Sequence, residues 1–77
     1  MSQGYSQRFI ARNREADGRS LGVALGRVCI KHDVPVIAVA KALGISRATV
    51  YNWFLGDCIP KPKYHLEIRK LIQHYVG

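Results

Sequence analysis

The stretch from Val36 to Leu55, VIAVAKALGISRATVYNWFL, constrains the fold more than any other part of this 77-residue chain. Apolar residues recur at helical intervals in its first half, at Val36, Val39, Ala40 and Leu43. Gly44 follows, and a residue without Cβ easily adopts the left-handed conformation that ends many helices. Ser46 suits the N-cap of a second helix, because its hydroxyl can accept a hydrogen bond from a free backbone N–H. The pattern therefore predicts two short helices that cross over a tight turn.

The second of these helices is predicted to have a buried side and a polar side. Val50, Trp53 and Phe54 are expected to face the core, and Ile45 in the turn is expected to point back toward it. The outward residues are then Arg47, Ala48, Thr49, Tyr51 and Asn52. Arginine can donate two hydrogen bonds to guanine, asparagine can pair with adenine, and small methyl groups contact thymine. The segment has the form of a helix-turn-helix whose second helix, about residues 46–55, enters the major groove of double-stranded DNA. A two-helix corner of a small bundle without DNA contact is the alternative.

The charge balance favours a polyanionic partner. Lysine and arginine total 12 against 5 acidic residues, which gives a formal net charge of +7. Nucleic acid is the commonest partner of such a domain, while membrane surfaces and acidic proteins are alternatives. Since 48% of the residues are hydrophobic, the chain is expected to fold as one small domain.

Other function classes lack their sequence signals. No apolar run follows Met1, and the longest apolar stretch, Val34 to Ala40, is too short to span a bilayer. We therefore expect a cytoplasmic protein, in a bacterium or a phage-infected host cell, that has no membrane partner. Cys29 and Cys58, with three histidines, do not have the paired spacing of a zinc site, so no metal, disulfide or cofactor is expected. Nothing groups a nucleophile with a base and an orienting carboxylate, so an enzyme is not expected.

The rest of the chain is predicted to add two helices and an arm. Residues 1–18 hold several arginines among polar residues and are expected to be mostly a flexible basic arm, although Phe9 and Ile10 could begin a short helix. Such an arm could follow the DNA backbone or simply keep the protein soluble. A helix is predicted over 20–32, capped by Ser20, in which Gly22 and Gly26 either allow close packing or merely weaken the helix. A second, amphipathic helix is predicted over 63–76, after a stretch, 57–62, that contains two prolines. The expected fold is all-α with four helices in a domain that spans 19–77.

The segment from Ser20 to Tyr75, and AKALGISRATVYNW above all, resembles the Cro/repressor-type helix-turn-helix family of phage and bacterial regulators. The resemblance implies a small lambda repressor-like domain that binds operators as a dimer. It implies base readout by Arg47, Ala48 and Asn52. It also implies contacts to the DNA backbone or to base edges by Ser46, Thr49, Tyr51, Lys61 and Lys63. The run WFLGDCIPK is similar to the corresponding loop of phage activators in this class.

Three positions depart from the family pattern. Val36 stands where many members have a phosphate-binding Gln. Cys29 and Phe54 stand where many members have an Arg–Glu ion pair, and we expect them to touch as an apolar pair. No fifth helix is expected to provide the usual dimer interface, so a homodimer remains an open expectation.

Two functions compete on this evidence. The first is a sequence-specific double-stranded DNA-binding transcriptional regulator. The second is a protein-interaction module on the same scaffold that binds and modulates an RNA polymerase or another host factor, which exposed aromatic or apolar anchors would favour. The residues whose exposure would indicate this module are Tyr51, Phe54, Leu55 and Tyr64.

Overall fold

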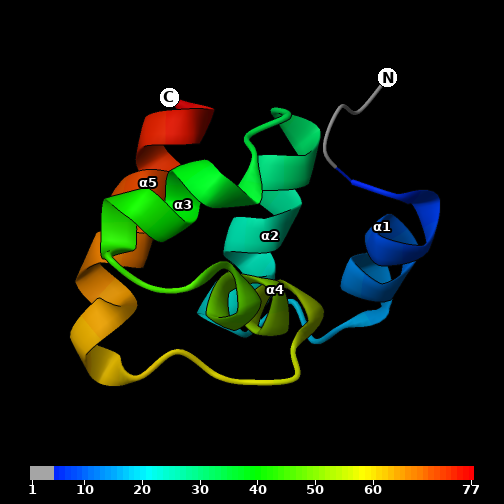
Figure 1. The fold of residues 1–77 in the computed structure, drawn as a ribbon, viewed down its shortest axis with the longest axis horizontal. Helices are drawn as coiled ribbons and strands as arrows, with labels where there is room; N and C mark the ends of the chain where they lie inside the picture. The colour runs from blue at the N-terminus through cyan, green and yellow to red at the C-terminus, as the bar shows by residue number, and fades with distance from the viewer. Residues whose placement is uncertain (1–4) are drawn as a thin grey trace.

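The computed structural model describes residues 5–77, and these form an all-helical fold without strands, as predicted. The elements, in chain order, are α1 (Gln7–Glu15), α2 (Leu21–Lys31), α3 (Val36–Leu43), α4 (Arg47–Leu55), the 3-10 turn η1 (Pro62–Tyr64) and α5 (His65–Val76). Figure 1 shows them packed into one globule. The prediction of four helices was one short, because the N-terminal region also folds into a helix. No helix within residues 5–77 is long and apolar enough to cross a lipid bilayer.

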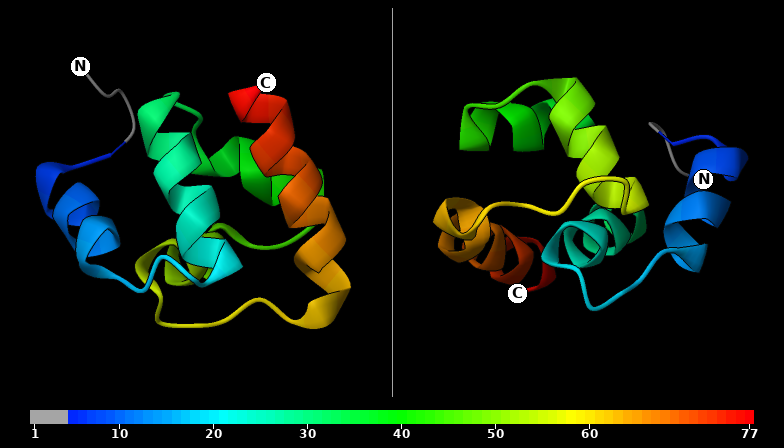
Figure 2. Two further views of the ribbon diagram at one scale, coloured as in Figure 1. Left: turned by 180° about the vertical axis from the view of Figure 1, so that it is seen from behind. Right: turned by 90° about the horizontal axis from the view of Figure 1, so that it is seen from below.

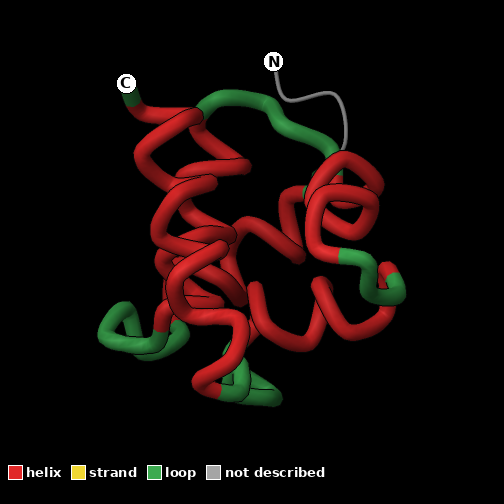
Figure 3. Tube along the Cα trace, turned by 90° about the vertical axis from the view of Figure 1, so that its left-hand side faces the viewer, coloured by secondary structure: helices red, strands yellow, loops and turns green. Residues whose placement is uncertain are grey.

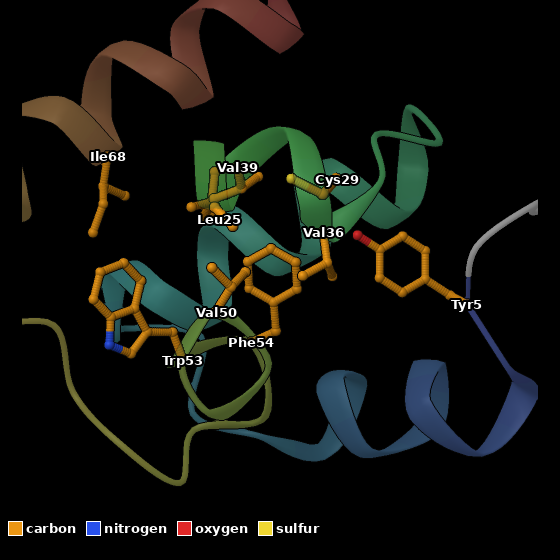
Figure 4. Packing of buried hydrophobic residues seen from close by; sticks show 10 residues of the cluster. Tyr5, Leu25, Cys29, Val36, Val39, Val50, Trp53, Phe54 and Ile68 are labelled. Carbon is orange, nitrogen blue, oxygen red and sulfur yellow. The ribbon is translucent and has the colours of Figure 1, made fainter. Parts of the chain in front are cut away.

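Helix α2 lies at the centre and packs against α1, α4 and α5 (Figure 2). The largest fully buried side chains come from four helices: Phe54, Leu25, Ile68, Val23, Val39, Val50 and Cys29. Figure 4 shows most of them converging between α2, α3, α4 and α5. Cys29 and Phe54 are both completely buried in this core. Both side chains are therefore apolar core residues, and the contact expected between them stays a prediction.

Two glycines let α2 approach α4 closely. A Cβ added at Gly22 would lie 2.7 Å from the Trp53 Cβ and 2.9 Å from its carbonyl oxygen. A Cβ added at Gly26 would lie 2.8 Å from the Phe54 ring. All three distances are shorter than van der Waals contact. The close-packing interpretation of these glycines is therefore confirmed, even though glycine weakens an isolated helix.

The connection between α3 and α4 has the expected chemistry. Gly44 ends α3 in the left-handed conformation, with φ 67°. The Ile45 N–H then donates to the Ala40 carbonyl at 3.1 Å, and the Ile45 side chain is partly buried against the core. Ser46 caps α4. Three residues therefore turn the chain between two helices, as the pattern predicted. Figure 3 shows loops and turns, in green, joining the helices of the described residues.

The prediction of a flexible arm over 1–18 was wrong for the residues that the structure describes. Ser6 caps α1 by accepting a hydrogen bond from the Phe9 N–H at 3.1 Å. Tyr5 is only 8% exposed, and burial raises the pKa of its phenol, which donates to the Val34 carbonyl at 2.7 Å. Long-range packing, which a short-range pattern does not show, holds this segment in place. Residues 1–4 of the proposed arm lie outside the described residues.

The starts of two helices differ from the prediction. Ser20 does occupy the N-cap of α2, but its hydroxyl is buried without a hydrogen-bond partner, so it does not cap the helix. The last helix begins at His65 instead of about Lys63, because the chain first makes the 3-10 turn at Pro62–Tyr64. The inner side of α5 follows the predicted pattern, with Ile68 fully buried.

Candidate nucleic-acid interface

Helix α4 separates buried and exposed side chains as its sequence predicted. Val50 and Phe54 are 0% exposed and Trp53 is 3% exposed. On the outer side, four side chains are exposed and Thr49 is half-buried. The exposed four are Arg47, Ala48, Tyr51 and Asn52. A polar ridge from Arg47 to Asn52 is therefore free of contacts that would bury it inside the molecule.

The outer residues of α4 have a fixed order around the helix. At 3.6 residues per turn, Ala48 and Asn52 share the middle of the exposed face, opposite the buried side. Arg47 and Tyr51 lie along one edge of that face, and Thr49 lies along the other. The Tyr51 edge meets α1, where the Phe9 and Tyr51 rings contact edge-to-face with centroids 5.4 Å apart. The Thr49 edge borders a groove whose other walls include Lys61 and Tyr64.

The start of α4 is organised by Ser46. Its Oγ accepts a hydrogen bond from the Thr49 N–H at 3.2 Å and lies 2.9 Å from the Thr49 Oγ1. The Thr49 hydroxyl is thus occupied within the protein. The first turn of α4 carries no acidic residue, so the partial positive charge of the helix N-terminus is not neutralised there. The absence of a carboxylate in this turn leaves the N-terminus of α4 favourable to a negatively charged group.

The two serines at N-cap positions provide a matched comparison of capping. We expect Ser46→Ala to lower the free energy of unfolding by about 1 kcal/mol, because the Thr49 N–H loses its acceptor. Ser20→Ala should cause no such loss, since the Ser20 hydroxyl makes no hydrogen bond. Urea unfolding followed by circular dichroism measures both. Equal losses in the two variants would contradict the capping role of Ser46.

Lysines border the Thr49 side of the interface. Lys61 and Lys63 are exposed in the segment between α4 and α5, and the Lys63 Nζ lies 5.1 Å from the centre of the Tyr64 ring. Residues 47–64 contain three basic residues and one acidic residue, Asp57. The local charge of α4 and the loop that follows it is therefore positive.

The residues proposed as anchors for a protein partner are mostly not free. Phe54 is fully buried, while Leu55 and Tyr64 are half-buried. Tyr51 is 39% exposed, with one edge of its ring against Phe9. Two apolar side chains elsewhere have larger exposed fractions, namely Ile59 (77%) and Leu66 (63%).

The cysteines and histidines are dispersed. Burial raises the pKa of the Cys29 thiol to about 12, so this side chain is a neutral member of the core. Cys58 is exposed on the loop after α4. Across residues 5–77, no three side chains of the types His, Cys, Asp and Glu come together as a metal site would require.

Helix α1 borders the exposed face of α4, and the sequence assigned no residue of α1 to this surface. The available signal was Ser6 as a cap followed by inward residues at Phe9, Ile10 and Asn13. It was weak because the one α1 side chain that is fully enclosed, Asn13 at 2% exposure, is polar. Charge and polarity made the segment resemble a solvated arm.

No protein-family model, curated protein or solved structure matches this chain. The resemblance to Cro/repressor-type regulators therefore depends on the residues of this sequence alone.

Proposed function

We propose that this protein is a sequence-specific double-stranded DNA-binding transcriptional regulator in which α3 and α4 act as a helix-turn-helix. The observation that supports it best is the division of α4 into a fully buried apolar side and an exposed polar side. An exposed helix face bearing Arg47, Ala48 and Asn52 offers the hydrogen-bond donors, acceptor and methyl group that distinguish base pairs in the major groove. Such a protein would act in the cytoplasm of a bacterium or a phage-infected cell.

In this proposal the remaining predicted site residues hold α4 in position on the DNA. Ser46 and Thr49 are joined to each other at the start of α4, and Tyr51 stands at its edge, so these three residues contact phosphates or base edges beside the main base-reading positions. Lys61 and Lys63 neutralise phosphates from the loop. Contacts to phosphate position a protein on DNA, whereas contacts to base edges supply specificity.

One copy of α4 can read only a few base pairs, because the helix has nine residues. Regulators of this size commonly place two recognition helices one turn of DNA apart by forming a dimer. A homodimer on a palindromic operator is thus part of the proposal.

The test is selection from a pool of random duplexes, followed by affinity measurements on the enriched duplex and on a shuffled one. Arg47→Ala should weaken binding to the enriched duplex by about 1–3 kcal/mol and relax the preference at one base. Lys61→Ala should weaken binding to both duplexes alike, because a phosphate contact carries no sequence information. No enrichment, or the same uniform loss in both variants, would overturn the proposed division of roles.

A second candidate function is a protein-interaction module that binds RNA polymerase or another host factor. The exposed aromatic and apolar side chains that could serve as its anchors are Tyr51, Ile59 and Leu66. Indifference to DNA at moderate salt, together with a stable complex with purified RNA polymerase, would support this function over the first.

A further inference from the structure

The strongest remaining feature is the position of α1 along one side of α4. Three side chains hold it there by hydrogen bonds. The Tyr5 hydroxyl donates to the Val34 carbonyl, and the Asn13 Nδ2 donates to the Phe54 carbonyl at 2.7 Å and to the Val23 carbonyl at 3.3 Å. The Arg27 guanidinium also donates to carbonyls at the end of α1, including the Ala16 carbonyl at 2.9 Å. Helix α1 is therefore a fixed part of the domain.

The contacts also give its direction. Phe9 meets Tyr51, and four residues later Asn13 meets the Phe54 carbonyl. Helix α1 thus runs in the same general sense as α4 but inclined to it: in the right-hand view of Figure 2 the blue and yellow-green helices both descend and converge. It lies on the edge of α4 that carries Arg47 and Tyr51, opposite the edge that faces Lys61.

One arginine of α1, Arg12, is placed toward the end of α4 by its contact with Asp57, and Arg8 shares its side of α1. Arg8 and Arg12 are one turn apart and therefore neighbours on the helix surface. The Arg12 Nη2 lies 3.5 Å from the Asp57 Oδ2, just past the end of α4, and the Arg12 side chain remains 53% exposed. Arg8 is exposed as well. Arg14 instead lines a groove between α1 and α2.

From this arrangement we infer that Arg8 and Arg12 form a phosphate clamp along one strand of bound DNA, while Lys61 and Lys63 contact the opposite strand. The inference rests on the proposed function. A helix in a major groove about 12 Å wide is bordered by phosphate chains on both sides. Packed helices lie about 8–10 Å apart. A helix fixed beside the recognition helix is thus at the right separation for its arginines to reach the bordering phosphates, and arginine is well suited to phosphate oxygens.

The test compares two double variants that remove the same charge. Arg8→Ala with Arg12→Ala removes the clamp, and Arg69→Ala with Lys70→Ala removes two exposed cations from α5 as a control. Affinity is measured against salt concentration on the enriched duplex and on a shuffled duplex. The plot of log affinity against log salt has a negative slope, and the clamp variant should make it less steep by about 1.8, since each phosphate contact contributes about 0.9. Binding to both duplexes should weaken on the order of tenfold at low salt, while the control variant should change the slope much less.

A third variant tests the same surface in the opposite direction. Asp57→Asn removes the carboxylate beside Arg12 and should raise affinity for both duplexes. Equal losses in the two double variants would mean a general charge effect and would overturn the clamp. An unchanged slope in the clamp variant, with sequence preference still lost in Arg47→Ala, would overturn the clamp but not the proposed function. If the unaltered protein enriched no duplex, both proposals would fall together. Circular dichroism and urea unfolding of each variant would identify any loss that comes from unfolding.

Discussion

Replacing Phe54 by Ala should lower the free energy of unfolding by about 3–5 kcal/mol, because a fully buried phenyl ring is lost and a cavity remains. The Phe54 ring of α4 lies against α2 and the N-terminal segment: a Cβ at Gly26 of α2 would touch it, and its centroid is 6.5 Å from those of Tyr5 and Phe9. Small domains have total stabilities of about 5–15 kcal/mol, so the variant should lose a large part of its folded population at moderate urea.

Urea unfolding measured by circular dichroism and by Trp53 fluorescence would give this change. The matched control is Leu66→Ala, because Leu66 is 63% exposed and its truncation should change stability by no more than about 0.5 kcal/mol. A loss below about 1 kcal/mol for Phe54→Ala would show that the buried position of this ring is wrong. The same experiment bears on the interface, since Phe54 helps to hold the exposed face of α4 in place.

Asn13→Asp should destabilise the protein by about 3 kcal/mol at pH 7, the upper end of the range for an unpaired buried polar group. The substitution keeps the shape of the side chain. It replaces the Nδ2 donor, which serves two carbonyl oxygens, with a carboxylate oxygen that cannot donate. The variant therefore loses both hydrogen bonds and places a charge where the side chain is 2% exposed. Asn52→Asp, the same chemical change on the exposed side of α4, should change stability by no more than about 0.5 kcal/mol.

The loss in Asn13→Asp should also depend on pH. Burial disfavours the charged carboxylate, so the pKa of the introduced carboxyl should be higher in the folded state than in the unfolded chain. The folded state then binds more protons, and the deficit should grow as pH rises from about 4, the unfolded-chain value. Unfolding curves at several pH values would measure this trend against the unaltered protein. A deficit independent of pH, or equal deficits in the two Asn→Asp variants, would contradict the buried amide bridge between α1 and α4.

The α3–α4 segment was predictable because its structure depends on local chemistry. Gly44 permits a left-handed residue, Ser46 offers an acceptor one turn from Thr49, and Val50, Trp53 and Phe54 recur at helical spacing. Each of these signals acts over three or four residues. The burial of Cys29 together with Phe54 followed from counting along the same pattern. The DNA-reading roles of Arg47, Ala48 and Asn52 remain predictions.

Helix α1 could not be placed in this way. Its anchors join residues far apart in the chain: Tyr5 to Val34, and Asn13 to Phe54. Asn13 looks like a surface residue until a carbonyl at the end of α4 is brought against it. Ser20 shows the opposite case, where a good capping residue at the N-cap position makes no capping bond.

The sequence by itself thus determined the helical class, the turn between α3 and α4 and the two sides of α4, because hydrophobic spacing and caps act within one or two turns. Only the tertiary structure decided that the N-terminal arginines stand on a fixed helix beside α4. That outcome depends on buried hydrogen bonds and ring contacts between segments about 30 to 40 residues apart, which form only once the core has brought those segments together.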